Sequence, residues 1–393
     1  MQKAKQFAAL FAAVLAFVAV GSEASARKVG SEFRVNTTTA GGQAFSSVAA
    51  LNDGGFLAVW TSWDDESGSG DVFAQRYDSI GAPMGSEFEV NTVTAGSQIS
   101  SGVAGLSGGG FVVVWTVIDQ VGPDAPGIYA QVYDSSGARV GSEIGVSEGN
   151  AFEVDVAGLR DGGFAIAFSS KEGVYVRIYG ATGSLLSRLL HVDRPITAIN
   201  KELGNIAALP HGGFVVVWQS DEGSAYQIYG QRFTAIGRRL GSEFNINSTG
   251  QGARPKVIGL RGDGFVVVWI AQMSNNFWAV NGQRYDANGT TIGTPFQVNT
   301  NSLQGADVAR VGALRSGGFV VAWDSSPVDD IHAQRYDAAG ARYGTEFLVN
   351  TYTRYDQDLP SLAGLANGGF VVIWDSELQD GSGWGVYGQR YNK

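Results

Sequence analysis

Short apolar runs alternate along the chain with glycine-rich polar stretches, and the alternation is periodic. The most regular landmark is a Gly-Phe pair followed by aliphatic residues and, in six of its seven copies, by tryptophan. The phenylalanine of this pair recurs every 50 to 55 residues, at Phe56, Phe111, Phe164, Phe214, Phe265, Phe319 and Phe370. Repeats of this length are typical of stacked or radially arranged supersecondary units.

Each repeat contains four strand-like segments, here named a to d. In the fifth copy they are PKVIGL (255–260), GFVVVW (264–269), NGQRYD (281–286) and FQVNT (296–300). Turns such as NDGG between a and b, and DSSGARVG between c and d, supply the positive φ angles of tight hairpins, so each repeat is predicted to be an antiparallel meander. Segment b is apolar at consecutive positions, which indicates burial on both faces and therefore sheets stacked face to face.

Segment a carries a further clue, because a small residue precedes its final leucine in every copy. These residues are Ala50, Gly105, Gly158, Ala208, Gly259, Ala313 and Gly364. Seven strands that converge on one axis need small side chains there, so the pattern predicts an all-β, seven-bladed β-propeller of four-stranded blades, with a innermost and d outermost. The strand pattern excludes a helical solenoid, and an open β-solenoid would leave ends that need caps.

The two ends of the chain predict how the ring closes. Residues 28–37, KVGSEFRVNT, form a d segment with no a, b or c before it, whereas the last repeat ends after its c segment, GWGVYGQRYNK (383–393). The N-terminal strand is therefore expected to complete the last blade and to hide both free edges. An open array with a loose strand at each end is the alternative.

The segments VGSEFxVNT, DGGFVVVW and YGQRYD resemble the repeats of bacterial secreted β-propeller proteins, including modules of large surface proteins that carry hemolysin-type calcium-binding repeats. The resemblance extends over essentially all of residues 27–393 and implies the propeller fold. The calcium-binding nonapeptide GGxGxDxUx is absent from this sequence, so the resemblance implies no calcium β-roll.

The first 26 residues are predicted to be a signal peptide. Lys3 and Lys5 precede an apolar run from Phe7 to Val20, and a small-residue cleavage site, Ala-Ser-Ala, ends at residue 26. The run is shorter than the roughly 20 residues that span a bilayer. Residues 27–393 are therefore expected to form one propeller domain, secreted or periplasmic and monomeric, with no transmembrane segment once the signal is removed.

Composition narrows the range of functions. The chain has no cysteine, which excludes disulfides, thiolate metal sites and thiol catalysis. Its net charge of −10 becomes −11 for residues 27–393, where 25 basic residues face 36 acidic ones. A chain this acidic is a poor binder of nucleic acid phosphates, so no nucleic acid partner is expected.

The loops from b to c and from d to a vary between repeats, whereas the turns at the opposite end are monotonous. Divergent loops on a repeated scaffold commonly build binding sites. Aromatic residues in these loops can stack on sugar rings, and the candidates are Trp63, Tyr226, Trp278 and Trp384. They predict a non-catalytic module that binds glycan or another cell-surface component. The alternative is that these rings pack over the blade edges as lids.

Acidic residues crowd the loops of the first, sixth and seventh blades: Asp64, Asp65, Glu66 and Asp71; Asp324, Asp329 and Asp330; and Asp375, Glu377 and Asp380. Clusters of oxygen ligands suit calcium, so calcium is a candidate cofactor, but the spacing only loosely follows a calcium-binding loop. A solvated acidic rim is the favoured alternative. Metal ligands are left unassigned.

No catalytic residue is predicted, because the sequence lacks a Gly-x-Ser-x-Gly elbow, HExxH, a phosphate loop and a sialidase-type Asp-box. Segment c carries Gln-Arg-Tyr in four copies and Gln-Arg-Phe in a fifth (231–233), which indicates a structural role, and its arginine is expected to pair with the glutamate of GSEF. Two other hypotheses remain: an envelope scaffold for protein partners, and a polysaccharide-cleaving lyase or hydrolase. An enzyme site would use the divergent third blade, with Arg177, Arg188, His191 and Arg194, unless that blade has simply drifted.

Overall fold

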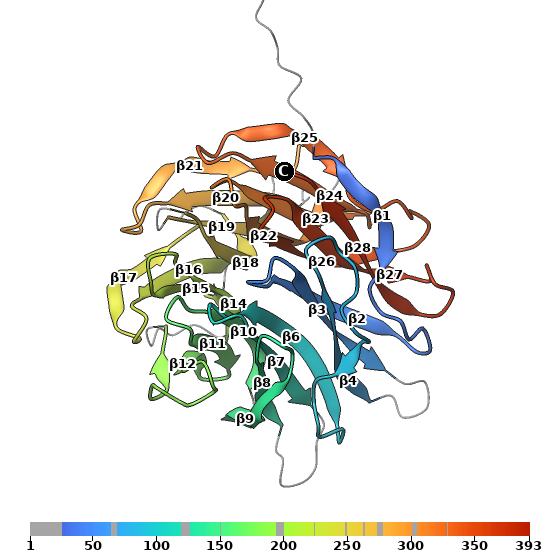
Figure 1. The fold of residues 1–393 in the computed structure, drawn as a ribbon. Helices are drawn as coiled ribbons and strands as arrows, with labels where there is room; N and C mark the ends of the chain where they lie inside the picture. The colour runs from blue at the N-terminus through green and yellow to red at the C-terminus, as the bar shows by residue number, and fades with distance from the viewer. Residues whose placement is uncertain are drawn as a thin grey trace, which may run out of the picture.

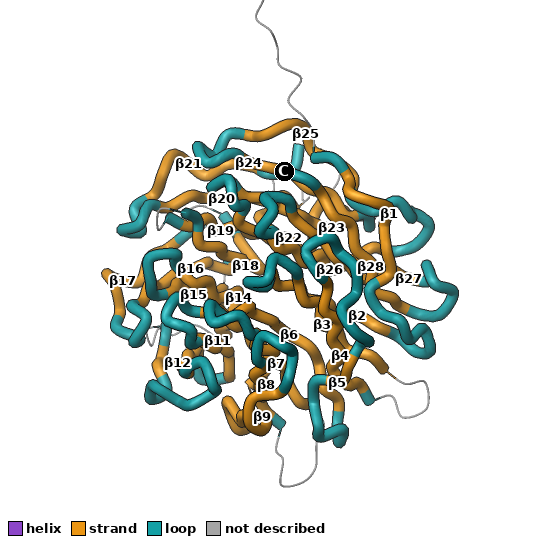
Figure 2. Tube along the Cα trace, viewed as in Figure 1, coloured by secondary structure: helices purple, strands orange, loops and turns teal. Residues whose placement is uncertain are grey.

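The computed structural model describes residues 26–63, 69–118, 126–149, 151–193, 200–223, 225–247, 250–261, 264–272, 278–300, 305–327 and 329–393. Within these residues the chain forms seven four-stranded antiparallel sheets. The sheets are arranged around one axis, and the strands are joined by turns and loops (Figures 1 and 2). This confirms the seven-bladed propeller.

Each of blades 1 to 4 runs outward from the axis in chain order. Blade 1 contains β2 (Gln43–Ala50), β3 (Phe56–Trp63), β4 (Gly70–Tyr77) and β5 (Phe88–Glu89). Blade 2 contains β6 (Ser97–Gly105), β7 (Phe111–Ile118), β8 (Gly127–Tyr133) and β9 (Arg139–Glu148). Blade 3 contains β10 (Ala151–Gly158), β11 (Phe164–Ser170), β12 (Gly173–Tyr179) and β13 (Leu190–His191). Blade 4 contains β14 (Asn200–Ala208), β15 (Phe214–Asp221), β16 (Tyr226–Phe233) and β17 (Arg239–Asn245).

Blades 5 and 6 follow the same order, and blade 7 is assembled from both ends of the ring. Blade 5 contains β18 (Gly252–Gly259), β19 (Phe265–Gln272), β20 (Trp278–Tyr285) and β21 (Thr291–Gln297). Blade 6 contains β22 (Gly305–Ala313), β23 (Phe319–Ser326), β24 (Ile331–Tyr336) and β25 (Arg342–Leu348). Blade 7 contains β26 (Gln357–Gly364), β27 (Phe370–Glu377), β28 (Trp384–Tyr391) and β1 (Lys28–Arg34).

Strand β1 closes the ring, as expected. It pairs antiparallel with β28, with Lys28 opposite Tyr391 and Arg34 opposite Tyr387. In Figure 1 the blue strand β1 lies beside the dark red strand β28. The side chain of Asn36, just beyond β1, accepts a hydrogen bond from the Val386 amide at 2.8 Å. The free edge of β28 is therefore covered by the other end of the chain.

Close backbone packing explains the glycine that precedes each landmark phenylalanine. A Cβ atom built on Gly318 would lie 2.1 Å from the carbonyl oxygen of Tyr336, at the end of the neighbouring strand β24. The equivalent glycines of the other six blades would place a Cβ 2.0 to 2.7 Å from the corresponding oxygen. The phenylalanine then stacks on the same aromatic residue, as Phe319 does on Tyr336 at 4.6 Å between ring centroids.

The substitution Gly318→Ala is expected to destabilise the protein by about 2 to 3 kcal/mol, because the new methyl group must displace backbone rather than a flexible side chain. Denaturant unfolding followed by tryptophan fluorescence measures this loss. Gly108→Ala is the matched control, since a Cβ at Gly108 meets nothing within 4 Å. Equal unfolding midpoints for the two variants would contradict this account of the repeat.

The small residues before the terminal leucines lie where the inner strands approach one another. A Cβ on Gly158 would lie 2.2 Å from the Gly105 carbonyl oxygen, and one on Gly105 would lie 2.4 Å from the Ala50 oxygen. Each glycine therefore abuts the backbone of the preceding blade. This confirms that the a segments are innermost and converge on the axis.

The outer strands differ from the prediction in position. Segment d of blade 5 was expected at 296–300, whereas β21 spans Thr291–Gln297. The reason is a side chain that substitutes for backbone pairing: Asn299 Oδ1 accepts the Val280 amide at 2.9 Å, just beyond the strand. Asparagine makes the same bond at the end of the outer strand in four other blades, with Asn36, Asn91, Asn247 and Asn350 as acceptors.

The expected pairing of the c-strand arginine with the GSEF glutamate is wrong. The glutamate instead holds the end of the preceding blade's outer strand: Glu346 Oε2 accepts the amide of Thr300 at 2.8 Å and its hydroxyl at 2.9 Å. Otherwise these polar groups would lose their partners at a strand end. The arginine bonds carbonyl oxygens of the next blade, as Arg284 Nη2 does to Ala338 at 3.0 Å.

Candidate functional site

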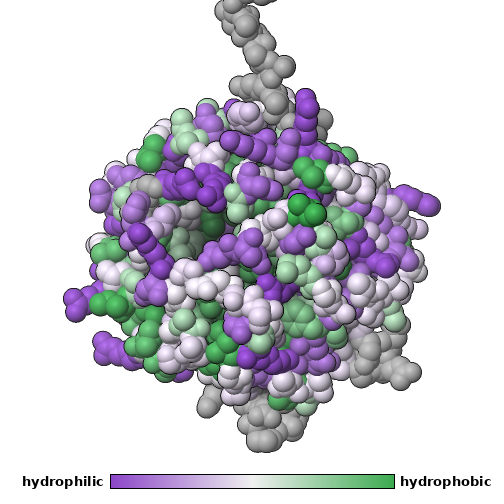
Figure 3. Space-filling view, viewed as in Figure 1, coloured by the Kyte–Doolittle hydropathy of each residue, from purple (hydrophilic) through white to green (hydrophobic). Residues whose placement is uncertain are grey.

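The inner strands of all seven blades enclose a cavity of about 550 Å³ on the propeller axis. Because every inner strand contributes to the wall, the cavity joins residues more than 300 positions apart, such as Ser47 and Leu362. Figure 3 shows hydrophilic and hydrophobic side chains interspersed over the face in view.

One level of the cavity wall varies strongly between the blades. Each inner strand presents a residue there that pairs with the fourth residue of the neighbouring b strand, so the seven positions are structurally equivalent. Their occupants are Ser47, Gly102, Asp155, Asn205, Lys256, Arg310 and Ser361. The next position along each strand is Val, Ile or Leu in every blade, whereas this ring carries hydroxyl, amide, acidic and basic groups.

The acidic part of the cavity comes from β10. Asp155 accepts hydrogen bonds from the side chain of Asn205 and from the Ile206 amide, the latter at 3.1 Å. Glu153, two residues earlier, accepts the hydroxyl of Ser169 at 3.0 Å. Burial raises the pKa of both carboxyls, more than their hydrogen bonds lower it. Both groups therefore hold protons more tightly than free carboxylates do.

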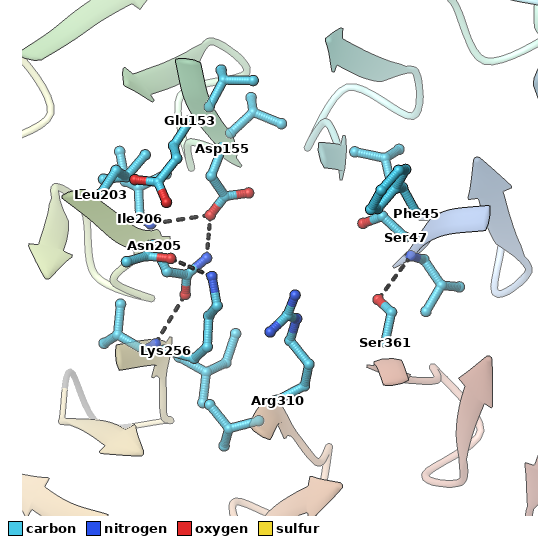
Figure 4. A pocket seen from close by; sticks show the side chains of 18 of the residues that line it. Phe45, Ser47, Glu153, Asp155, Leu203, Asn205, Ile206, Lys256, Arg310 and Ser361 are labelled. Atoms are coloured by element: carbon cyan, nitrogen blue, oxygen red, sulfur yellow. Dashed lines mark hydrogen bonds between the residues drawn. The ribbon is translucent and has the colours of Figure 1, made fainter. Parts of the chain in front are cut away.

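The basic part of the cavity comes from β18 and β22. Lys256 donates a hydrogen bond to the Gly204 carbonyl oxygen, and burial lowers its pKa to about 7. Arg310 projects into the cavity (Figure 4), and its guanidinium donates one hydrogen bond within the described residues, to the Ala309 carbonyl oxygen at 3.3 Å. Since a guanidinium has five N–H donors, most of those of Arg310 face the cavity without a protein acceptor.

Two exposed phenylalanines contribute apolar surface to the cavity. Phe45 is 43 % exposed and Phe152 is 39 % exposed. Phe45 adopts a positive φ of 56°, which is unusual for an aromatic residue. Its amide donates to Asp375 Oδ2 at 2.6 Å, and its ring meets Trp63 edge-on at 5.6 Å. Arg254 and Leu359 have a similar positive φ at the equivalent bulges of blades 5 and 7, so this backbone conformation belongs to the repeat.

The four aromatic residues proposed from the sequence lie outside this cavity. Tyr226, Trp278 and Trp384 are the first residues of β16, β20 and β28, and Trp63 is the last residue of β3. Trp278 packs against the core between blades 5 and 6, and Trp63 covers Gly70 and touches Phe45. Trp63 and Trp278 are half-buried, whereas Tyr226 is 39 % exposed.

The acidic rim is only partly what the sequence indicated. Asp324 and Asp375 are buried, and both accept hydrogen bonds from backbone amides. Asp324, for example, accepts one from the Val308 amide at 2.6 Å. Asp64, Asp65 and Glu66 lie outside the described residues. Among the residues that the structure describes, no group of three or more His, Cys, Asp or Glu side chains is arranged to hold a metal ion.

Asp358 is expected to make stability depend on pH. Burial, followed by repulsion from Asp324, Asp329, Asp356 and Asp307, raises its pKa from 3.8 to about 7. Because the folded protein binds this proton more tightly than the unfolded chain does, the stabilisation is complete below about pH 4 and is lost as the pH rises to 7.

The substitution Asp358→Asn should therefore raise the free energy of unfolding at pH 8 by about 1 to 2 kcal/mol, after allowance for solvent screening, and leave it unchanged near pH 4. Guanidinium unfolding at both pH values tests this. A gain of equal size at pH 4 and pH 8 would contradict the electrostatic cause.

The third blade holds its candidate residues apart from the cavity. His191, on the outer strand β13, stacks on Tyr175 at 4.8 Å, and its Nε2 lies 3.1 Å from Asp193 Oδ1. Arg188 is exposed, Arg177 is half-buried in β12, and Arg194 lies outside the described residues. The same blade supplies Glu153 and Asp155 to the cavity instead. Charged residues within an otherwise apolar inner strand were the signal that could have located this site.

Comparisons with known proteins agree on the fold. No protein-family model and no curated protein matches the sequence. Among solved structures, a protein of unknown function from Dyadobacter fermentans has a TM-score of 0.61 and 12 % identity, over 93 % of this chain and 99 % of that one.

Two carbohydrate-acting enzymes also have similar folds. The NanB sialidase of Streptococcus pneumoniae has a TM-score of 0.50 and 10 % identity, over 93 % of this chain and 71 % of that one. An α-L-arabinofuranosidase of Fusarium graminearum has a TM-score of 0.50 and 10 % identity, over 92 % of this chain and 98 % of that one. At these identities the comparisons establish a shared propeller fold. Within the described residues, no helix has the length and apolar character to cross a membrane.

Proposed function

We propose that this protein is a secreted or periplasmic carbohydrate-binding propeller whose ligand enters the axial cavity. The observation that carries the proposal is the ring of seven equivalent positions that six different residue types occupy inside an otherwise repeated scaffold. Carbohydrate recognition uses a few polar groups for hydroxyls together with an aromatic face for the sugar ring, and the cavity offers both. Its volume of about 550 Å³ lies in the range of small-molecule sites.

The charge of the cavity favours a sugar that carries a carboxylate. Arg310 presents unshared donors, and a guanidinium binds a carboxylate through two parallel hydrogen bonds. Lys256 adds a second cation below its pKa of about 7. On the opposite side, Asp155 and Glu153 are placed to accept hydrogen bonds from hydroxyls. An acidic sugar therefore offers a carboxylate to the basic side of the cavity and hydroxyls to the acidic side.

The fold is compatible with this proposal, since a sialidase and an arabinofuranosidase are built on similar propellers. The repeat resemblance to bacterial secreted propellers supports an extracytoplasmic site of action. A monomer is proposed as well, because the ring closes on itself through β1 and β28.

A second candidate function is cleavage of the bound polysaccharide. The specific observation is that Lys256, with a pKa of about 7, shares the cavity with two carboxyls of raised pKa. A group that titrates near neutrality is suited to proton transfer. Release of new reducing ends or unsaturated products from an acidic polysaccharide, lost in Lys256→Met, would identify an enzyme.

A glycan array probed with residues 27–393 tests the proposal. Two variants accompany it: Arg310→Gln in the cavity, and a triple alanine variant of the rim residues Tyr226, Trp278 and Trp384, each checked for folding by circular dichroism. Binding of acidic glycans that is lost in Arg310→Gln and kept in the rim variant is expected. Loss only in the rim variant would move the site to the loops, and no binding to any glycan would overturn the proposal.

A further inference from the structure

Five blades carry an arginine at the same position of the third strand, and four of these arginines fasten neighbouring blades together. Each donates to a carbonyl oxygen in the c–d turn of the next blade: Arg76 to Ser135, Arg232 to Ala287, Arg284 to Ala338 and Ala339, and Arg390 to Ser79 and Ile80. A glycine in each receiving turn leaves room for the guanidinium. A Cβ on Gly340, for example, would lie 2.4 Å from Arg284 Nη1.

The fifth arginine, Arg335 in β24, has no such partner. The next blade is blade 7, where β28 and β1 come from opposite ends of the ring and are not joined by a c–d turn. In Figure 1 this seam lies near the end of the chain marked C. Arg335 is only 6 % exposed, yet no residue that the structure describes accepts a hydrogen bond from its guanidinium, and Nε and Nη1 are fully buried.

The surroundings of Arg335 combine aromatic rings with charged groups of both signs. Its guanidinium carbon lies 4.8 Å from the ring centre of Tyr343 and 5.8 Å from that of Phe370. It lines a cavity of about 630 Å³ together with Ser316 and the side chain of Lys393. Asp337 also lines this cavity, and its carboxylate already accepts the Ala341 amide at 2.8 Å.

A buried cation without hydrogen-bond acceptors is costly, and elsewhere in this ring the same side chain always finds carbonyl oxygens. We propose that the cavity beside Arg335 is an oxyanion site. A carboxylate or phosphate group bound there takes the place of the c–d turn that blade 7 lacks. Arg335 supplies a charged guanidinium donor and Lys393 a second positive charge. Because the anion bridges blades 6 and 7, its binding stabilises the closed ring.

Titration with inorganic phosphate, at constant ionic strength and followed by ³¹P NMR and isothermal calorimetry, tests the site. Residues 27–393 should bind phosphate with a Kd in the millimolar range or below. Arg335→Gln and Lys393→Ala should each weaken binding by about tenfold or more. Lys393 is exposed, so its variant keeps the fold even if Arg335→Gln does not.

Arg284→Gln is the matched control, since Arg284 occupies the equivalent position and bonds a turn that is present. Its phosphate affinity should equal that of the unaltered protein. Acetate added together with phosphate should compete for the same site. This competition tests whether the site also binds a carboxylate. The proposal is overturned by absent binding up to about 50 mM, where a millimolar site would be saturated. Equal losses in the Arg284 and Arg335 variants would overturn it as well.

Discussion

Removal of residues 27–36 is expected to leave the protein unable to hold its ring. The deletion takes away β1, which covers β28, together with Phe33 and Val35 from the core between blades 7 and 1. Loss of two such apolar side chains costs about 3 to 6 kcal/mol by itself, against a typical stability of about 5 to 15 kcal/mol. The deletion also removes Asn36, whose side chain bonds both Val386 and Gln43.

Size-exclusion chromatography and guanidinium unfolding of the deletion variant measure this effect. A large fall in the unfolding midpoint and self-association through the exposed edge of β28 are expected. A synthetic peptide of residues 27–38 should restore the midpoint, whereas the same peptide with Val35→Asp should not. A deletion variant that unfolds at the midpoint of the intact protein would contradict closure by β1.

Replacement of Arg310 by glutamine is expected to weaken the binding of an acidic glycan by about 10- to 100-fold, because a hydrogen bond to a charged group contributes about 1.5 to 3 kcal/mol. Binding of a neutral glycan should change little, since glutamine still offers a donor. The affinity for the acidic glycan should also fall as the pH rises above 7, where Lys256 loses its proton.

Arg254→Gln is the control for this prediction. Arg254 is an exposed arginine of the same inner strand as Lys256, and it donates to the Asp307 carbonyl oxygen at 2.9 Å without lining the cavity. The substitution Arg254→Gln removes one positive charge near the cavity, as Arg310→Gln does, but leaves the proposed contact between Arg310 and the ligand intact. Equal losses for the two variants would indicate a long-range charge effect and would contradict a direct contact through Arg310.

The fold could be predicted because each of its determinants is local in sequence and repeated seven times. The glycine before each landmark phenylalanine and the small residue before each terminal leucine are both required by a close contact with neighbouring backbone. The outer strands could not be placed so well. Their ends depend on side chains such as Asn299, which replaces a backbone partner just beyond the strand. The asparagine recurs in the sequence, but its pattern does not show that it ends the strand.

The site was harder to predict, because charged residues in an apolar strand mark that strand as unusual but do not show whether they face solvent or an axial cavity. Only the closure of the ring places Asp155, Lys256 and Arg310 at one level around a shared cavity. The loop aromatics were visible as single residues, but their packing was not: Trp278 belongs partly to the core. Likewise, no pattern in the sequence indicated that Phe45 lines the cavity.

A crystal structure of residues 27–393 soaked with an acidic oligosaccharide tests the central claim most directly. We expect the sugar carboxylate on the guanidinium of Arg310, with hydroxyls toward Asp155 and a sugar ring against Phe45. Ligand density over Tyr226 and Trp384 at the loop rim, with the axial cavity left to solvent, would contradict the claim.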